Sequence, residues 1–338
     1  MEKTSKTLAG IFAILFVITT ALAFVLFNLE QSLFDAELYI QAFEKENLYQ
    51  RLPDLTAQAL NAAAQTADWS DPLILQLNLS EEEWKVFMAE LLPPAELETL
   101  AEDAVRQFIA LINGETDQVV LSLESLKTYM SSPQGINAIY GLLQAQPDCT
   151  VEQLTDMALG QQEMMLCNPP ETFLLLDLRP IIESQIKAAV LFMPEQVTLI
   201  SPNANRTQEL QNLKDTRTLM RLSPFLPIFC LLMITVLAVR SLGDWLNWWG
   251  YPLWLSGLFS IALIVLSRPL AAWIFRAFVA PVFPKMIPLG ILNMFEDIVA
   301  TIAYDAVQPT ARIAGIFIII GLIMVAIAFL FRKQLSKA

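Results

Sequence analysis

Four long apolar stretches without a charged residue constrain this chain more than any other feature. They are residues 8–27, 222–239, 251–267 and 313–331. The hydrocarbon core of a bilayer is about 30 Å thick, and a helix of about 17–25 apolar residues is long enough to cross it. The sequence therefore predicts a membrane protein, mainly α-helical, with four transmembrane helices.

The first stretch also carries a pattern found at signal-peptide cleavage sites, because Ala21, Leu22 and Ala23 fit the small-residue rule. The apolar run continues beyond this point through residues 24–27 and is longer than the apolar region of an ordinary signal peptide. We therefore expect an uncleaved signal anchor.

Basic residues flank the first and last stretches. Lys3 and Lys6 precede the first, and Arg332, Lys333 and Lys337 follow the last. Basic residues next to membrane helices favour the cytoplasmic side. We expect both termini to be cytoplasmic and the protein to lie in the plasma membrane, with residues 29–221 outside.

The acidity of the chain is confined to this long segment. Residues 28–221 hold 29 acidic and 11 basic side chains, a net charge of −18, whereas the rest of the chain holds 5 acidic and 10 basic ones. Such a domain does not attract nucleic acid, which proteins bind by neutralising phosphates. Its charge keeps it soluble or attracts cations or basic partners.

These boundaries divide the chain into five parts. They are a cytoplasmic N-terminus with the first span (1–28), an acidic extracytoplasmic domain (29–221), two spans (222–267), an outer interfacial or amphipathic segment (268–312), and the last span with a basic tail (313–338). The acidic domain is long enough to bury a core of its own.

Helical periodicity predominates in the acidic domain. Ser80 and Glu83 form a capping-box pattern before an apolar helical face, and a second helix after Pro94 is expected to stop at Gly114. Residues 32–65 indicate two amphipathic helices that break near Pro53. By contrast, residues 118–124 and 195–201 alternate like strands, and pairing them would add a small sheet.

The segment 268–312 has two halves with different patterns. Arg276 and Lys285 make its first half a poor fifth span, so we expect it to lie at the membrane interface or to re-enter the bilayer. Its second half predicts an amphipathic helix over 290–308 with an acid-rich polar face. Because lipid headgroups favour a basic face, docking against protein is the better interpretation.

Two of the three cysteines, Cys149 and Cys167, lie in the acidic domain. Thr150 with Gln153 and then Gly160 indicate a short helix between them. In an oxidising compartment the pair predicts a structural disulfide. We expect Cys230, in the second span, to act as a small apolar residue.

Other roles for this cysteine pair have less support in the sequence. The spacing does not fit a redox C-x-x-C motif, and no histidine exists to complete a zinc site. The three methionines between the cysteines are the alternative ligands for copper, but they are more typical of a core. We therefore assign no metal, cofactor or catalytic residue from the sequence.

The sequence carries few signals of catalysis. Without histidine the chain cannot form Ser-His-Asp or Cys-His nucleophilic systems, and it holds no nucleotide-binding glycine loop. Acidic clusters are present at residues 81–83, 102–103 and 296–297, and a carboxylate pair could serve a hydrolase. We expect no enzyme, because charge runs on helices are usually solvated faces.

The leading hypothesis is therefore a non-enzymatic envelope protein whose outer helical domain binds a protein partner or ligand beside the lipid bilayer. The order of one anchor, a large outer domain and three further spans resembles that of transport-associated membrane subunits, in architecture alone. Two alternatives to this hypothesis stay open. One is a permease-like subunit driven by a separate cytoplasmic ATPase, and the other is a membrane-tethered hydrolase that uses carboxylates.

Overall fold

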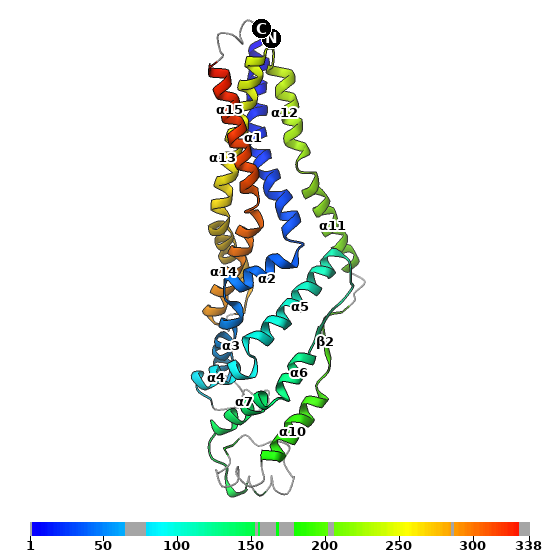
Figure 1. Ribbon diagram of the computed structural model, residues 1–338, viewed down its shortest axis with the longest axis vertical. Coiled ribbons are helices and arrows are strands. Elements are labelled where there is room, and N and C mark those ends of the chain that lie inside the picture. Colours follow the sequence, from blue (N-terminus) through cyan, green and yellow to red (C-terminus); the bar gives the residue numbers. More distant parts are fainter. Residues whose placement is uncertain are drawn as a thin grey trace.

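The computed structural model describes residues 2–64, 79–152, 155, 167–168, 179–201, 206–284 and 287–330. It is an elongated, mostly helical molecule in which a helical bundle occupies one end and a second group of shorter elements the other (Figure 1). The bundle, called the membrane bundle below, consists of α1 (Glu2–Ser32), α12 (Phe225–Ala238), α13 (Leu242–Ile274) and α15 (Thr310–Leu330).

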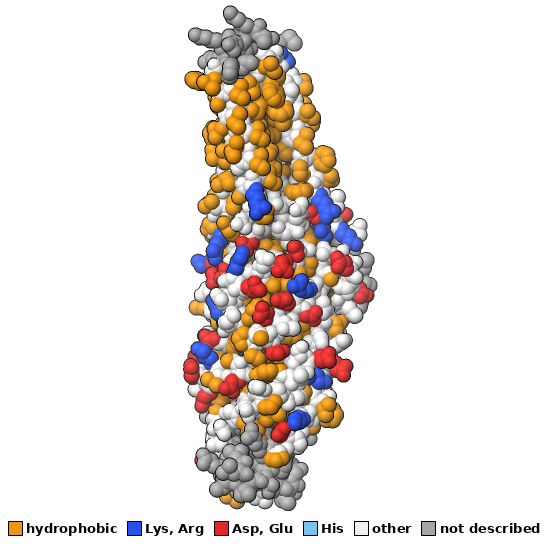
Figure 2. Space-filling view, in the orientation of Figure 1, with side chains coloured by type: hydrophobic (Ala, Val, Ile, Leu, Met, Phe, Trp, Pro, Cys, Tyr) orange, Lys and Arg blue, Asp and Glu red, His pale blue; other side chains and the backbone are white. Residues whose placement is uncertain are grey.

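Four helical segments are long and apolar enough to cross a membrane, which agrees with the predicted number. They are Thr4–Ser32, Gln211–Ala238, Leu242–Val282 and Thr310–Leu330. On the face shown in Figure 2, hydrophobic side chains cover most of the described part of this end, whereas acidic and basic side chains gather over the rest of the molecule. The described ends of α1 and α15 lie together at the apolar end, as an even number of spans requires (Figure 1).

The helices of the membrane bundle approach closely through small residues. A Cβ atom on Gly321 of α15 would lie 2.5 Å from the backbone nitrogen of Trp254 in α13, so glycine is required there. Such small-residue contacts are typical of helix pairs in membranes. Against α1, the side chains of Cys230 and Ile234 in α12 bury Phe16, which fits the reading of Cys230 as an apolar residue.

The third membrane helix is longer than its apolar stretch predicts. α13 has 33 residues and is therefore about 50 Å long, well beyond the hydrocarbon thickness. It starts at Leu242, so only residues 239–241 connect it to α12. It also continues past residue 267 to Ile274, and a π-helical turn (Phe275–Val279) and a 3₁₀ turn (Ala280–Val282) follow. The first part of segment 268–312 thus continues the helix of the third span.

The polar end of the molecule, called the head, contains the elements between α1 and α11. They are α2 (Ala36–Lys45), α3 (Leu48–Ala64), α4 (Glu81–Leu91), α5 (Pro94–Asn113), β1 (Val119–Ser122), α6 (Glu124–Met130), α7 (Pro133–Gln144), α10 (Arg179–Phe192) and β2 (Gln196–Ile200). α11 (Arg206–Leu222) then leads back to α12 (Figure 1).

Local signals in the sequence account for several of these elements. Ser80 and Glu83 form the predicted capping box of α4, and Gly114 ends α5 in the left-handed conformation with φ 76°. β1 and β2 pair as an antiparallel sheet, which confirms the expected pairing. Val120 in β1 also donates its backbone N–H to Gln107 of α5 at 2.8 Å, so the sheet lies on that helix.

The predicted break near Pro53 is wrong. The chain breaks earlier, at Asn47, which has φ 52°, a left-handed conformation that asparagine adopts more readily than most residues. Pro53 lies inside α3, where it removes one intrahelical hydrogen bond. The corner between α2 and α3 is therefore set by Asn47.

Candidate functional site

The helix α14 (Leu289–Val307) joins the head to the membrane bundle. Its apolar side chains Met294 and Ile298 pack against Leu55 of α3 and are almost completely buried. Partly buried side chains from α2, α3 and α14 surround them: Phe43, Leu48, Leu52, Ile291 and Ile302. The interpretation of this helix as one that docks against protein agrees with these contacts.

Part of the polar face of α14 is buried. Glu296 is buried and pairs with Arg276, which follows α13. Thr301 is also buried, and its hydroxyl donates a hydrogen bond to the carboxylate of Glu46 at the α2–α3 corner. These two polar side chains therefore face partners within the molecule, whereas Tyr304 on the same helix is exposed.

Ion pairs reinforce the same contact at its edges. Lys45 of α2 lies 2.9 Å from the carboxylate of Asp305, and Arg268 of α13 lies 3.3 Å from that of Glu46. These pairs connect α2 and the α2–α3 corner to α13 and α14. We call this contact region, formed by α14, the α2–α3 corner and the end of α13, the junction.

A buried carboxylate forms a second connection between the head and the membrane bundle. The side chain of Glu30 near the end of α1 is 3% exposed and lies 2.5 Å from Arg217 and 2.8 Å from Arg221 of α11. Arg217 also donates to the Asn113 side chain at 2.8 Å, and its guanidinium lies 4.3 Å from the ring centre of Phe34. This network links α1, α5 and α11 beside the apolar surface.

A groove between α4 and α7 is the clearest candidate for a binding surface on the head. Its cavity has a volume of about 240 Å³, and apolar side chains, among them Val86, Phe87 and Leu142, form most of its lining. Glu82 and Glu90, which are exposed, also line it. The groove therefore combines apolar side chains with negative charge.

Glu83 also lines this groove but has a structural partner. The hydroxyl and the backbone N–H of Ser80 both donate to its carboxylate at 2.7 Å. These hydrogen bonds lower the pKa of the Glu83 carboxyl below its usual range. Of the acidic side chains at the groove, Glu82 and Glu90 are therefore the better candidates for contacts with a partner.

The predicted disulfide partners lie together. The sulfur atoms of Cys149 and Cys167 are at disulfide distance, with Cα atoms 4.9 Å apart. The backbone N–H of Cys149 donates to the carbonyl of Asn168 at 2.9 Å, so the chain is also hydrogen-bonded beside the sulfurs. The short helix expected between the cysteines, and the methionines considered as copper ligands, lie outside the described residues, apart from residues 151, 152 and 155.

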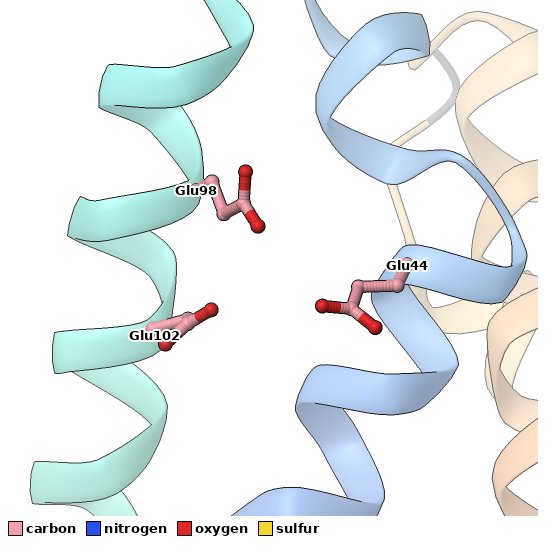
Figure 3. Close-up of side chains that lie close together, drawn as sticks. All are labelled: Glu44, Glu98 and Glu102. Atoms are coloured by element: carbon pink, nitrogen blue, oxygen red, sulfur yellow. The ribbon is translucent and has the colours of Figure 1, made fainter.

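The carboxylates considered for a hydrolase have separate surroundings. Glu296 belongs to the junction, and Asp297 lies 3.8 Å from Arg51. Asp103 accepts a hydrogen bond from Gln107 at 2.9 Å. Glu102 instead faces Glu44 and Glu98, as Figure 3 shows. Acidic side chains that are adjacent in sequence therefore face different partners in the structure.

Sequence reasoning missed the residues that form the second connection between the head and the membrane bundle. Glu30 and Arg217 are 187 positions apart, and neither forms a recognisable motif. One signal was present in the sequence, because Glu30 follows closely after an apolar span. A carboxylate that becomes buried at such a place needs a basic partner.

Comparison of the chain with models of known protein families, with curated proteins and with solved structures finds no match. The interpretation of its function therefore rests on its own residues.

Proposed function

We propose that this is a non-enzymatic membrane protein whose head lies outside the cytoplasm and binds a basic segment of a partner protein. The α4–α7 groove is the observation that carries this proposal. Its apolar side chains would cover the apolar side of the segment, while Glu82 and Glu90 would face its basic side chains. The strong acidity of residues 28–221 would favour the encounter with such a partner.

The junction supports a role in which the head is held against the membrane helices. Its buried apolar contacts and ion pairs involve α13, which is the third span, and α14, which leads to the fourth. A change in the head on binding would therefore act on α14 and on the helices beside it. The relay of a bound state into the membrane is part of this proposal.

The alternative of a transport subunit gains less support. A cytoplasmic ATPase would need a surface on the side of the termini, and the connection between α12 and α13 consists of residues 239–241 alone. The hydrolase alternative likewise lacks a specific observation, because several of its candidate carboxylates already have partners within the described structure.

Photo-crosslinking in membranes of the native host tests the proposed partner site. A photoreactive amino acid replaces Val86, which is 51% exposed in the groove, or Phe192, which is 89% exposed elsewhere on the head and serves as the matched control. We expect a protein adduct at position 86 that is absent at position 192. Its identity is read by mass spectrometry.

Reversing the charges of Glu82 and Glu90 tests whether the partner segment is basic. Combining Glu82→Lys with Glu90→Lys should abolish the adduct at position 86, because like charges then face a basic partner. Glu83 is left unchanged in this variant because it caps α4. An adduct that persists after charge reversal, or equal adducts at positions 86 and 192, would contradict the proposal.

A further inference from the structure

Three carboxylates meet between α2 and α5, away from the α4–α7 groove. Glu44 comes from the last turn of α2, and Glu98 and Glu102 come from successive turns of α5. An oxygen of each side chain lies within 4.8 Å of an oxygen of the others. Figure 3 shows the three groups directed at the same gap between the two helices.

This arrangement is unfavourable for the protein alone. Acidic side chains four positions apart on a helix repel each other, and a carboxylate near the C-terminus of a helix opposes the helix dipole. Arg106 reaches the cluster at 3.5 Å from Glu102, but it is shared with Glu37 at 3.7 Å and is 54% exposed. One shared arginine does not balance three carboxylates.

A buried tyrosine supplies a separate observation at the same place. Tyr49, in the first turn of α3, is 3% exposed, and its hydroxyl has no hydrogen-bond partner. A buried hydroxyl normally has a partner. Burial and the nearby charges of Glu102, Glu98 and Glu44 together raise the pKa of Tyr49 to about 12. The unpaired hydroxyl therefore lies near the three carboxylates, on a helix that packs against both α2 and α5.

We propose that Glu44, Glu98, Glu102 and Tyr49 form a calcium-binding site that links α2, α3 and α5. Carboxylates supply the hard oxygen ligands that calcium prefers, and waters would complete the coordination. The Tyr49 hydroxyl would donate a hydrogen bond to a liganding carboxylate or hold one of these waters. This inference does not depend on the proposed partner site.

The ligand set favours calcium over magnesium. Magnesium demands near-ideal octahedral geometry and gives up its water ligands reluctantly, so it is seldom held by protein carboxylates alone. Calcium accepts carboxylate oxygens in flexible geometries and higher numbers. Three carboxylates from two different helices, with oxygens within 4.8 Å of one another, fit this preference.

A thermal-unfolding titration of the full-length protein in detergent tests this site. The protein is first treated with a chelator, and its unfolding midpoint is then followed as calcium chloride is added. We expect the midpoint to rise with a dissociation constant of about 10⁻⁴–10⁻³ M, the range of calcium sites in extracellular modules. Calorimetric titration with calcium chloride measures the same constant independently.

Conservative variants separate binding from a purely structural role. Glu98→Gln and Glu102→Gln should lose the calcium-dependent rise, and without calcium they should unfold at or above the wild-type midpoint, because charge repulsion is relieved. Tyr49→Phe keeps the buried ring and should weaken calcium binding several-fold. Glu115→Gln, an exposed change just after the end of α5, should respond as the wild type does.

Three results would overturn the inference. The first is that calcium does not raise the unfolding midpoint of the wild type. The second is that calcium raises the midpoint of Glu98→Gln as much as that of the wild type. The third is that magnesium chloride at the same concentration raises the wild-type midpoint as much as calcium chloride does. Crosslinking at position 86 is measured separately, so failure of the calcium site can be told apart from failure of the partner site.

Discussion

Individual buried charges determine how the head is attached. Glu30 is nearly inaccessible, and taking a carboxylate out of water is costly unless basic groups compensate it. Arg217 and Arg221 provide this compensation from α11, a helix almost two hundred positions away in sequence. Residue-scale tests should therefore distinguish buried pairs from exposed ones.

Replacing Glu30 with glutamine should destabilise the full-length protein by about 1.5–3 kcal/mol, because Arg217 and Arg221 lose their charged hydrogen-bond acceptor in a partly buried site. Chemical unfolding in detergent measures this change. Asp54→Asn is the matched control, since it breaks an exposed pair with Lys85 and should cost less than about 1 kcal/mol. Equal losses in the two variants would show that burial of Glu30 is unimportant.

The raised pKa of Tyr49 predicts a specific pH dependence. The unfolded state loses the phenol proton near pH 10, whereas the folded state keeps it to about pH 12. The contribution of Tyr49 is therefore fully present below pH 10 and is lost as the pH rises toward 12. In calcium-free buffer, the unfolding midpoint of the wild type should fall more steeply over this interval than that of Tyr49→Phe. Parallel curves would contradict the assignment.

At the scale of single elements, the sequence was most informative where a local signal suffices. The capping box of α4, the glycine stop of α5 and the alternating patterns of β1 and β2 all correspond to the elements that form. Their physical causes lie within a few residues of each element, so no knowledge of the fold is needed.

Elements whose limits depend on distant partners were harder to predict. Arg268 suggested that the third span stops at residue 267, yet its charge is paired with Glu46 and the helix continues. Glu44 and Glu98 are far apart in sequence, so no motif could reveal their proximity. The ion pairs of the junction were missed for the same reason.

The docking of α14 should depend on its buried apolar face. Met294 is 1% exposed, so Met294→Ala removes most of a side chain from the junction and should destabilise the protein by about 2–5 kcal/mol. Leu289→Ala on the same helix is the control, because Leu289 is 76% exposed and its loss should have little effect. Thermal unfolding of both variants in detergent measures the difference, and similar midpoints would refute the docking.

The cysteine pairing can be tested by counting free thiols. Alkylation of the denatured, unreduced protein should modify Cys230 alone, because Cys149 and Cys167 are bonded to each other. After reduction all three cysteines should be modified. Mass spectrometry of the intact protein gives both numbers, and three modifications before reduction would exclude the disulfide.

The whole molecule has an apolar end that carries the described chain ends and a charged end that carries the head (Figures 1 and 2). The junction lies between them, and its contacts connect α2 and α3 to the elements leading into the third and fourth spans. The central claim is therefore that head and membrane helices are fastened together at α14. This claim applies to the protein in its membrane.

Cysteine crosslinking in native membranes tests this claim most directly. Lys45→Cys and Asp305→Cys are combined with Cys230→Ala, which removes the free native thiol, and a short bifunctional thiol reagent is added. Lys127→Cys with Asp305→Cys is the control, because Lys127 lies in α6, away from α14 (Figure 1). We predict an intramolecular crosslink between positions 45 and 305 and none between positions 127 and 305. No crosslink between positions 45 and 305, or equal crosslinking of the two pairs, would contradict the account.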